Sequence, residues 1–585
     1  MDCRLRRAAT RAVIGALGIA ALAGAVPARA GGRPLATERV IVTLHNDGAS
    51  SRVAAAVRSH RGRLLRALPL VHGFAAEVPV SYVPLLRQDP AVRSVTVDES
   101  LQLMAVNPDL GYDTATDFGG LQNIARVINA DDSWAAGYGG KGIDVALLDS
   151  GVSPVTGLTS GNVVNGPDLS FESQAPELAR LDTFGHGTHM ASIIAGRDVA
   201  QASPSGYVAD SSRFNGIAPD ARIVSVKVAD HSGATDVSQV IAGIDWIVEH
   251  AKDPGLNIRV LNLSFGTDST QLARLDPLCY AVEQAWKKGI VVVVSGGNGG
   301  GNATRLSNPA QDPFVIAVGA SDSNRTVAVS DDKVADFSSR GNATRHADFV
   351  APGVSVLGLR NPGGSVDLAN PGARVGTRFF RGSGTSQSAA VVSGAVALLL
   401  QRYPTMKPDQ VKRQLMNTAS TFSSGNSESR GAGVINVRKA QTTSAATVLS
   451  VTTTWGTGTG TLEDSRGSYH LVNGDQVLDG ERDIFGAAFD SQAWSTASAN
   501  GNAWSGGTWN GNAWSGNAWT SDDWTGHAWS GNAWSGNAWS DASWAGHAWT
   551  GNAWSGNAWS RSAWAGNAWT GNAWTGTPWM SSSWR

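Results

Sequence analysis

The stretch IDVALLDSG, residues 143–151, is the first of several apolar runs from which we predict the fold class. It is a short apolar run closed by Asp-Ser-Gly, and such runs are typical of strands that are buried on both faces of a sheet. Segments with helical spacing, among them residues 186–196 and 237–251, separate it from similar runs. The alternation predicts an α/β domain, a mostly parallel sheet with helices on both faces. The other runs are RIVSVKV (222–228), RVLNLSF (259–265), IVVVVSG (290–296) and FVIAVGA (314–320).

An aspartate, a histidine and a serine stand where nucleophilic catalysis needs them. Asp149 follows the first strand, and active sites of such sheets collect beyond the carboxyl ends of the strands. His186 stands in GHGTH, and Ser386 in GSGTSQSAA begins an apolar helix. A serine hydroxyl needs an imidazole to take its proton and a carboxylate to orient that imidazole. Singly, the aspartate is more simply a turn former and the serine a helix cap, so the combination carries the prediction.

The chain order Asp, His, Ser is that of subtilisin and differs from the orders in chymotrypsin and the α/β-hydrolases. On these motifs the chain resembles the subtilases, the subtilisin-like serine proteases. The resemblance implies that Asp149 orients the imidazole, His186 is the general base and Ser386 is the nucleophile. In VVVVSGGNGG (291–300) it makes Asn298 the side-chain donor to the oxyanion.

The resemblance also implies where substrate binds. NLSFG matches the strand on which subtilases bind substrate backbone as an added strand. The implied substrate-binding residues are Ser264, Phe265, Gly266, Gly296 and Gly297.

Other positions depart from the family pattern or leave choices open. Gln387 follows the serine where subtilases usually have Met, and Ala390 stands at their proline position, which puts substrate fit in question. A metal between His186 and His189 lacks a third ligand, so His189 is expected to be structural. The resemblance implies no cofactor for catalysis and a structural calcium ion, whose ligands are unknown.

The termini predict export and a zymogen. Residues 1–30 have a basic start, an apolar stretch and an Ala-x-Ala end, which is typical of a signal peptide. The order strand, helix, strand, strand, helix, strand between residues 38 and 99 suits a ferredoxin-like α+β unit, which resembles the inhibitory propeptide of subtilases. The predicted parts are a signal peptide (1–30), propeptide (31–105), catalytic domain (106–443), connector (444–492) and tail (493–585).

Net charge, hydropathy and cysteine content limit the kinds of binding partner and disulfide that we expect. The net charge of −2 gives no reason to expect nucleic acid as a partner, and no apolar stretch after the signal is long enough to span a membrane. Of the two cysteines, Cys3 leaves with the signal, so Cys279 has no partner in the mature chain and is expected to be a buried thiol. The expected location is extracellular, with cell-wall association as an alternative.

The tail is an internal repeat with a tryptophan at every fifth position from Trp504 to Trp584, and Trp494 precedes it. Three-residue strands joined by Gly-Asn turns would place successive indoles opposite each other; a β-solenoid and disorder are the other interpretations. Such a row suggests binding to cell-wall glycans, to other proteins or to its own copies.

The sequence thus predicts a secreted serine endopeptidase that processes itself and acts on proteins or peptides, with its own propeptide as a partner. Two other interpretations remain. The first is a surface adhesin or scaffold whose tail is the working part, and the second is an esterase that uses the same three residues.

Overall fold

The computed structural model describes residues 37–68, 72–97, 112–114, 116–174, 177–210, 212–446, 454–473, 476–483, 488–500, 559–560, 563–564 and 581–583. The predicted signal peptide and nearly all of the tryptophan repeats lie outside these residues. The chain divides into two compact units, Met1–Met104 and Ala105–Arg585. Within the described ranges, no helix has the length and apolar character needed to cross a membrane.

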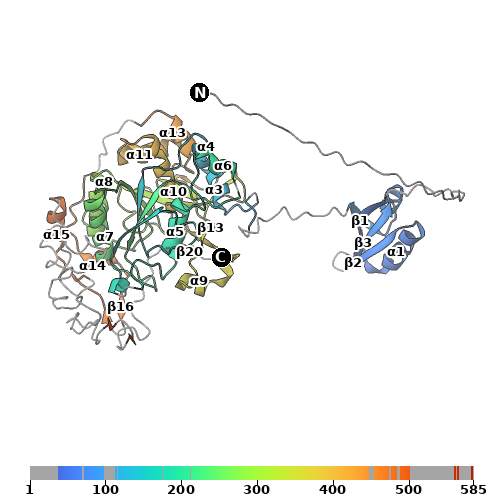
Figure 1. Ribbon diagram of the computed structural model, residues 1–585, viewed down its shortest axis with the longest axis horizontal. Coiled ribbons are helices and arrows are strands. Elements are labelled where there is room, and N and C mark those ends of the chain that lie inside the picture. The colour runs from blue at the N-terminus through green and yellow to red at the C-terminus, as the bar shows by residue number, and fades with distance from the viewer. Residues whose placement is uncertain are drawn as a thin grey trace, which may run out of the picture. The chain divides into compact units, whose positions relative to one another are not determined.

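The first unit is a small sandwich of one antiparallel sheet and two helices (Figure 1). The strand order is β2-β3-β1-β4, and the alternation of strands and helices is the one the sequence predicts. Alternate residues of the first strand, Val40, Val42 and Leu44, pack against Val53 and Val57 of the first helix. The elements are β1 (Thr37–Leu44), α1 (Ser50–Ser59), β2 (Arg63–Leu68), β3 (Gly73–Pro79), α2 (Val83–Arg87) and β4 (Val92–Val97).

A large sheet organises the second unit. Its order is β11-β10-β9-β8-β5-β7-β6, with β12 beside β10. All neighbours are parallel except β10 and β11, so the prediction of a mostly parallel sheet is confirmed. The strands are β5 (Asp144–Asp149), β6 (Val163–Asp168), β7 (Arg222–Lys227), β8 (Ile258–Leu263), β9 (Val291–Ser295), β10 (Ile316–Asp322), β11 (Lys333–Val334) and β12 (Phe349–Pro352).

Helices cover both faces of this sheet. Figure 1 shows α7 and α8 side by side on one face and α5 and α10 on the other. The helices are α3 (Leu121–Val127), α4 (Ala130–Ala135), α5 (His186–Ala195), α6 (Ser205–Ala209), α7 (Val237–His250), α8 (Pro277–Lys287), α9 (Ser365–Ala369), α10 (Thr385–Arg402), α11 (Pro408–Thr418), α12 (Ser427–Arg430), α13 (Val437–Thr442), α14 (Leu462–Arg466) and α15 (Ser491–Ala499).

A second, antiparallel sheet leads into α10. Its order is β13-β15-β14, and β20 pairs with β15 as well. The remaining strands of the described residues form two short hairpins, β16–β17 and β18–β19. In the second hairpin Trp559 pairs with Trp564. These strands are β13 (Val356–Leu359), β14 (Arg374–Val375), β15 (Phe379–Gly384), β16 (Val472–Asn473), β17 (Gln476–Val477), β18 (Trp559–Ser560), β19 (Ala563–Trp564) and β20 (Ser581–Ser583).

Helices α14 and α15 pack against the catalytic unit, α14 against α7 and α8 and α15 against α8, although the sequence predicts most of residues 454–500 to be a connector. Arg466 is fully buried, and its Nε lies 2.7 Å from Oδ1 of Asp236, the residue that caps α7. Further along, the Tyr280 hydroxyl donates to the carbonyl of Ser495 over 3.2 Å. On α8, Cys279 is buried as expected, and its thiol donates to Asn308 Oδ1 over 2.9 Å.

Candidate active site

Asp149 and His186 form a buried pair at the carboxyl edge of the sheet. Asp149 is the last residue of β5, and His186 is the first residue of α5. The histidine Nδ1 lies 2.8 Å and 2.9 Å from the two carboxylate oxygens, and both side chains are almost completely buried. Because Nδ1 faces a carboxylate, Nδ1–H is the donor to Asp149, and Nε2 is the ring nitrogen that points away from the carboxylate.

Two glycines allow the helix to approach the strand end this closely. A Cβ at Gly187 would lie 2.1 Å from the carbonyl oxygen of Gly151 and 3.2 Å from Asp149 Oδ1. Gly185, just before the helix, has φ +114°, a conformation that side chains with Cβ rarely adopt. The glycines of GHGTH are therefore required for packing and for the turn.

Ser386 lies in the first turn of α10, after the cap residue Gly384. It is fully buried, and its Oγ has no hydrogen-bond partner among the described residues. The first N–H groups of a helix have no acceptor within the helix, so the Ser386 amide is a donor near its own hydroxyl. Helices α5 and α10 contact each other, so the histidine and the serine belong to adjoining elements.

Asn298 is oriented by the residue before the serine. Its Oδ1 accepts hydrogen bonds from the Thr385 backbone N–H over 3.0 Å and from the Thr385 hydroxyl over 3.1 Å. A backbone N–H only donates, so the amide oxygen must face Thr385, and Nδ2 is left as the donor on the other side. The N–H of Gly297, which has φ +109°, donates to Thr385 Oγ1 over 3.2 Å.

The residues predicted to bind substrate follow two neighbouring strands. Ser264, Phe265 and Gly266 come directly after β8 and are buried, and Ser264 Oγ accepts from Asn262 Nδ2 over 3.1 Å. Gly296 follows β9, and its N–H donates to the carbonyl of Val318 over 2.8 Å. These residues thus lie at the same sheet edge as Asp149, because the strands are parallel.

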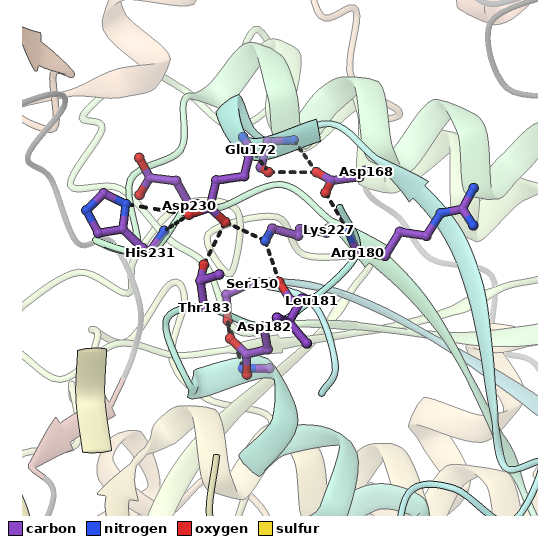
Figure 2. A network of polar contacts seen from close by, with 12 residues as sticks. Ser150, Asp168, Glu172, Arg180, Leu181, Asp182, Thr183, Lys227, Asp230 and His231 are labelled. Atoms are coloured by element: carbon purple, nitrogen blue, oxygen red, sulfur yellow. Dashed lines mark hydrogen bonds and ion pairs between the residues drawn. The ribbon is translucent and has the colours of Figure 1, made fainter. Parts of the chain in front are cut away.

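A polar network beneath the pair was not anticipated from the sequence (Figure 2). Ser150 donates its hydroxyl to Asp182 over 2.9 Å, and it accepts the backbone N–H of Gly187 over 2.9 Å. The Asp182 carboxylate also accepts the N–H groups of Gly185 (2.6 Å) and Thr188 (2.7 Å). Burial raises the pKa of Asp182. Asp182 therefore holds both the strand end and the start of α5.

The network continues to a buried ion pair. Lys227 Nζ lies 2.6 Å from Glu172 Oε2, which also accepts the Thr183 hydroxyl over 2.6 Å (Figure 2). The half-exposed His231 ring lies 3.5 Å from Oε1 of the same glutamate. Burial alone would raise the pKa of Glu172, but the hydrogen bond with His231 and the charge of Lys227 outweigh burial and lower it.

The sequence holds two signals for this network. An acidic residue shortly before a helix start, as Asp182 is before His186, is the pattern of a cap for free N–H groups. A lysine inside a buried strand, as in RIVSVKV, predicts a paired charge, because lysine is almost never buried alone.

His189 is bound to backbone. Its Nε2 donates to the carbonyl of Phe380 over 3.1 Å, and burial lowers its pKa to about 3, so it is neutral. In the ranges that the structure covers, no group of three or more His, Cys, Asp or Glu is arranged to hold a metal ion. The ligands of the calcium ion that the resemblance implies stay unassigned, since calcium also binds backbone and amide oxygens.

A parallel sheet with a buried Asp–His pair and a serine at a helix start at its carboxyl edge is the arrangement of a serine hydrolase. The sequence profile of the subtilase family (Peptidase_S8) matches residues 140–467. The chain belongs to this family of serine proteases, whose substrates are proteins.

Two relatives compared by sequence agree with the family. The chain is 32% identical to serine protease AprX of Bacillus subtilis over 386 residues, which cover 65% of this chain and 81% of AprX. It is 34% identical to subtilisin DY of Bacillus licheniformis over 54% of this chain and 96% of that protein. The structure of fervidolysin from Fervidobacterium pennivorans, a keratinolytic enzyme related to subtilisin, aligns with a TM-score of 0.43 and 25% identity. That alignment covers 71% of this chain and 62% of fervidolysin, less than two thirds.

Proposed function

We propose that this subtilase is a secreted serine endopeptidase that acts through Asp149, His186 and Ser386, with Asn298 as oxyanion donor. The observation that carries the proposal is the pair of hydrogen bonds from His186 Nδ1 to Asp149. It sets the imidazole tautomer that a general base needs, at the edge where the serine stands.

The steps follow from these positions. His186 Nε2 takes the Ser386 proton as Oγ attacks the substrate carbonyl, and the imidazolium that forms is stabilised by Asp149. The Ser386 N–H and Asn298 Nδ2 donate to the oxyanion. His186 then protonates the leaving amine, and water hydrolyses the acyl-enzyme by the same route. The serine–histidine hydrogen bond often tightens only when substrate binds.

Substrate backbone is proposed to add as a strand to residues 264–266, with Gly296 and Gly297 alongside it. Glycine leaves room for backbone to pass closely at these positions. The first unit is proposed to be a propeptide that the protease cuts away, because its element order and its place before the catalytic unit suit that role. Export is proposed from the pattern of residues 1–30, and the ligands of the tryptophan tail stay a prediction.

The test combines mass analysis of the purified protein with a casein assay. Ser386→Ala should retain the first unit and should not digest casein, whereas wild type should lose that unit and digest casein. Ser423→Ala, at an exposed position, is the matched control and should behave as wild type. Normal processing and digestion by Ser386→Ala would refute the proposed nucleophile. Activity on simple esters alone would favour the esterase interpretation.

A second variant tests the oxyanion donor. Asn298→Ala should lower kcat by roughly 100- to 1000-fold with little change in KM, because such a donor acts mainly in the transition state; the subtilisin asparagine is the known example. The exposed Asn302→Ala in the same loop is the control. A rise in KM with kcat unchanged would instead assign Asn298 to ground-state binding.

A further inference from the structure

Residues 581–583 pair with the strand that leads to the proposed nucleophile. Strand β20 (Ser581–Ser583), which is labelled in Figure 1, is antiparallel to β15, with Ser583 opposite Ser383 and Ser581 opposite Gly384. A register shift lies between these two pairs. β20 therefore binds β15 by its backbone, as an added strand.

This pairing lies beside Ser386. Ser383 and Gly384 precede the serine by three and two residues, and Gly384 is the cap residue of α10. β20 also contacts α10 itself. The rest of β15 is already paired with β13 at Val356–Leu359, so β20 takes the part of the strand nearest to the nucleophile.

The catalytic groups are closed off in this state. The Ser386 residue and the His186 side chain have no exposed surface. A protein substrate must bring a backbone carbonyl within about 3–3.5 Å of the serine oxygen to react. The arrangement with β20 in place is thus one in which substrate does not reach Ser386.

We propose that β20 covers the edge of β15 beside Ser386, excludes substrate from that edge and inhibits the protease in cis. This inference rests on the proposed function. Residues 264–266, where substrate backbone is proposed to add, follow β8, which is a different strand from β15. In this inference the residues before the scissile bond lie along 264–266 and those after it lie along β15, so β20 competes with the latter.

A three-residue strand is a weak ligand, but here it is tethered. Tethering raises the effective concentration of a segment to about the millimolar range, so weak pairing can still compete with substrate. Competition raises the apparent KM and leaves kcat unchanged.

The test compares four mature proteins: the full chain, a truncation after Gly576, Ser581→Pro/Ser583→Pro, and Ser581→Ala/Ser583→Ala. Proline lacks the N–H and disrupts pairing, whereas alanine keeps the backbone donors, so the alanine protein is the matched control. The probe is a fluorogenic peptide with at least three residues on each side of the scissile bond. A short anilide substrate, which has no residue after that bond, serves for comparison. Mass analysis of each protein and its melting temperature accompany the kinetics.

Truncation and the proline variant should lower the KM for the long peptide at least about threefold, change the anilide KM less and leave kcat unchanged. The alanine protein should match the full chain. The synthetic peptide TPWMSSSWR (577–585) should inhibit the truncated enzyme competitively. Equal KM values in all four proteins would overturn the inference, and so would a mature wild type that has lost residues 577–585. If no variant digests casein or reacts with a fluorophosphonate at Ser386, the proposed function itself fails.

Discussion

Trp494 donates its indole Nε1–H to the carboxylate of Asp245 over 2.9 Å, and both residues are buried. The tryptophan lies on α15, the aspartate on α7, and the indole meets the Tyr280 ring edge to face at 5.6 Å. The tryptophan that precedes the repeats is thus part of the core of the protease unit. A shared core means that residues 488–500 contribute to the stability of that unit.

Trp494→Ala should destabilise the mature protein by about 3–5 kcal/mol, the usual cost of emptying a buried aromatic site. Urea unfolding, monitored by circular dichroism, measures this change in the free energy of unfolding. Leu272→Ala, at an exposed position, should change stability by less than about 0.5 kcal/mol. Equal effects of the two variants would mean that α15 does not stabilise the fold.

Asp245 should make stability fall with rising pH. Burial raises its pKa to about 8, although the Trp494 donor acts against the shift. The folded state therefore binds a proton that the unfolded state has released, and stability decreases from about pH 4 to pH 8 and levels off above. Asp245→Asn removes this titrating group. The stability of the variant relative to wild type should therefore increase from pH 5 to pH 8. Urea unfolding of both proteins at pH 5, 6.5 and 8 tests this prediction. A difference in the free energy of unfolding that is the same at all three pH values would contradict it.

Asp182 should act as a positioning residue for His186. Asp182→Asn replaces a carboxylate that accepts the N–H groups of Gly185 and Thr188 with an amide. Bonds to charged groups contribute about 1.5–3 kcal/mol, so kcat should fall roughly 10- to 100-fold with little change in KM. The pH–rate profile should also shift, which a general loss of folded protein would not cause. Asp210→Asn, in a surface loop, is the control and should keep the wild-type profile.

Removing one partner of the Lys227–Glu172 pair should lower stability strongly, whereas replacing both partners should lower it little. Lys227→Met leaves a buried carboxylate uncompensated, which costs about 3–5 kcal/mol. Adding Glu172→Gln removes that charge, so the double variant should recover most of the loss. A double-mutant cycle in urea measures the coupling. Additive effects would mean that the half-exposed His231, not Lys227, neutralises the glutamate.

Local patterns were enough to predict most of the sheet. The five apolar runs became β5, β7, β8, β9 and β10, because a strand buried on both faces needs apolar residues throughout. The resemblance to the subtilases predicts that Asp149 orients His186, and in the structure His186 Nδ1 lies 2.8 Å from the Asp149 carboxylate. The roles of these residues remain predictions that the variants above test.

Sequence patterns predict the five buried strands and the strands and helices of the first unit, since hydrophobic period and turn chemistry act between near neighbours in the chain. The candidates for catalysis come from the resemblance to the subtilases. Contacts between distant segments are seen in the tertiary structure alone. Arg466 meets Asp236, Trp494 meets Asp245, and β20 meets β15 across separations of roughly 200 residues or more. No periodic pattern in the sequence predicts these contacts. Whether burying and pairing these groups is favourable depends on which surfaces the completed fold brings together.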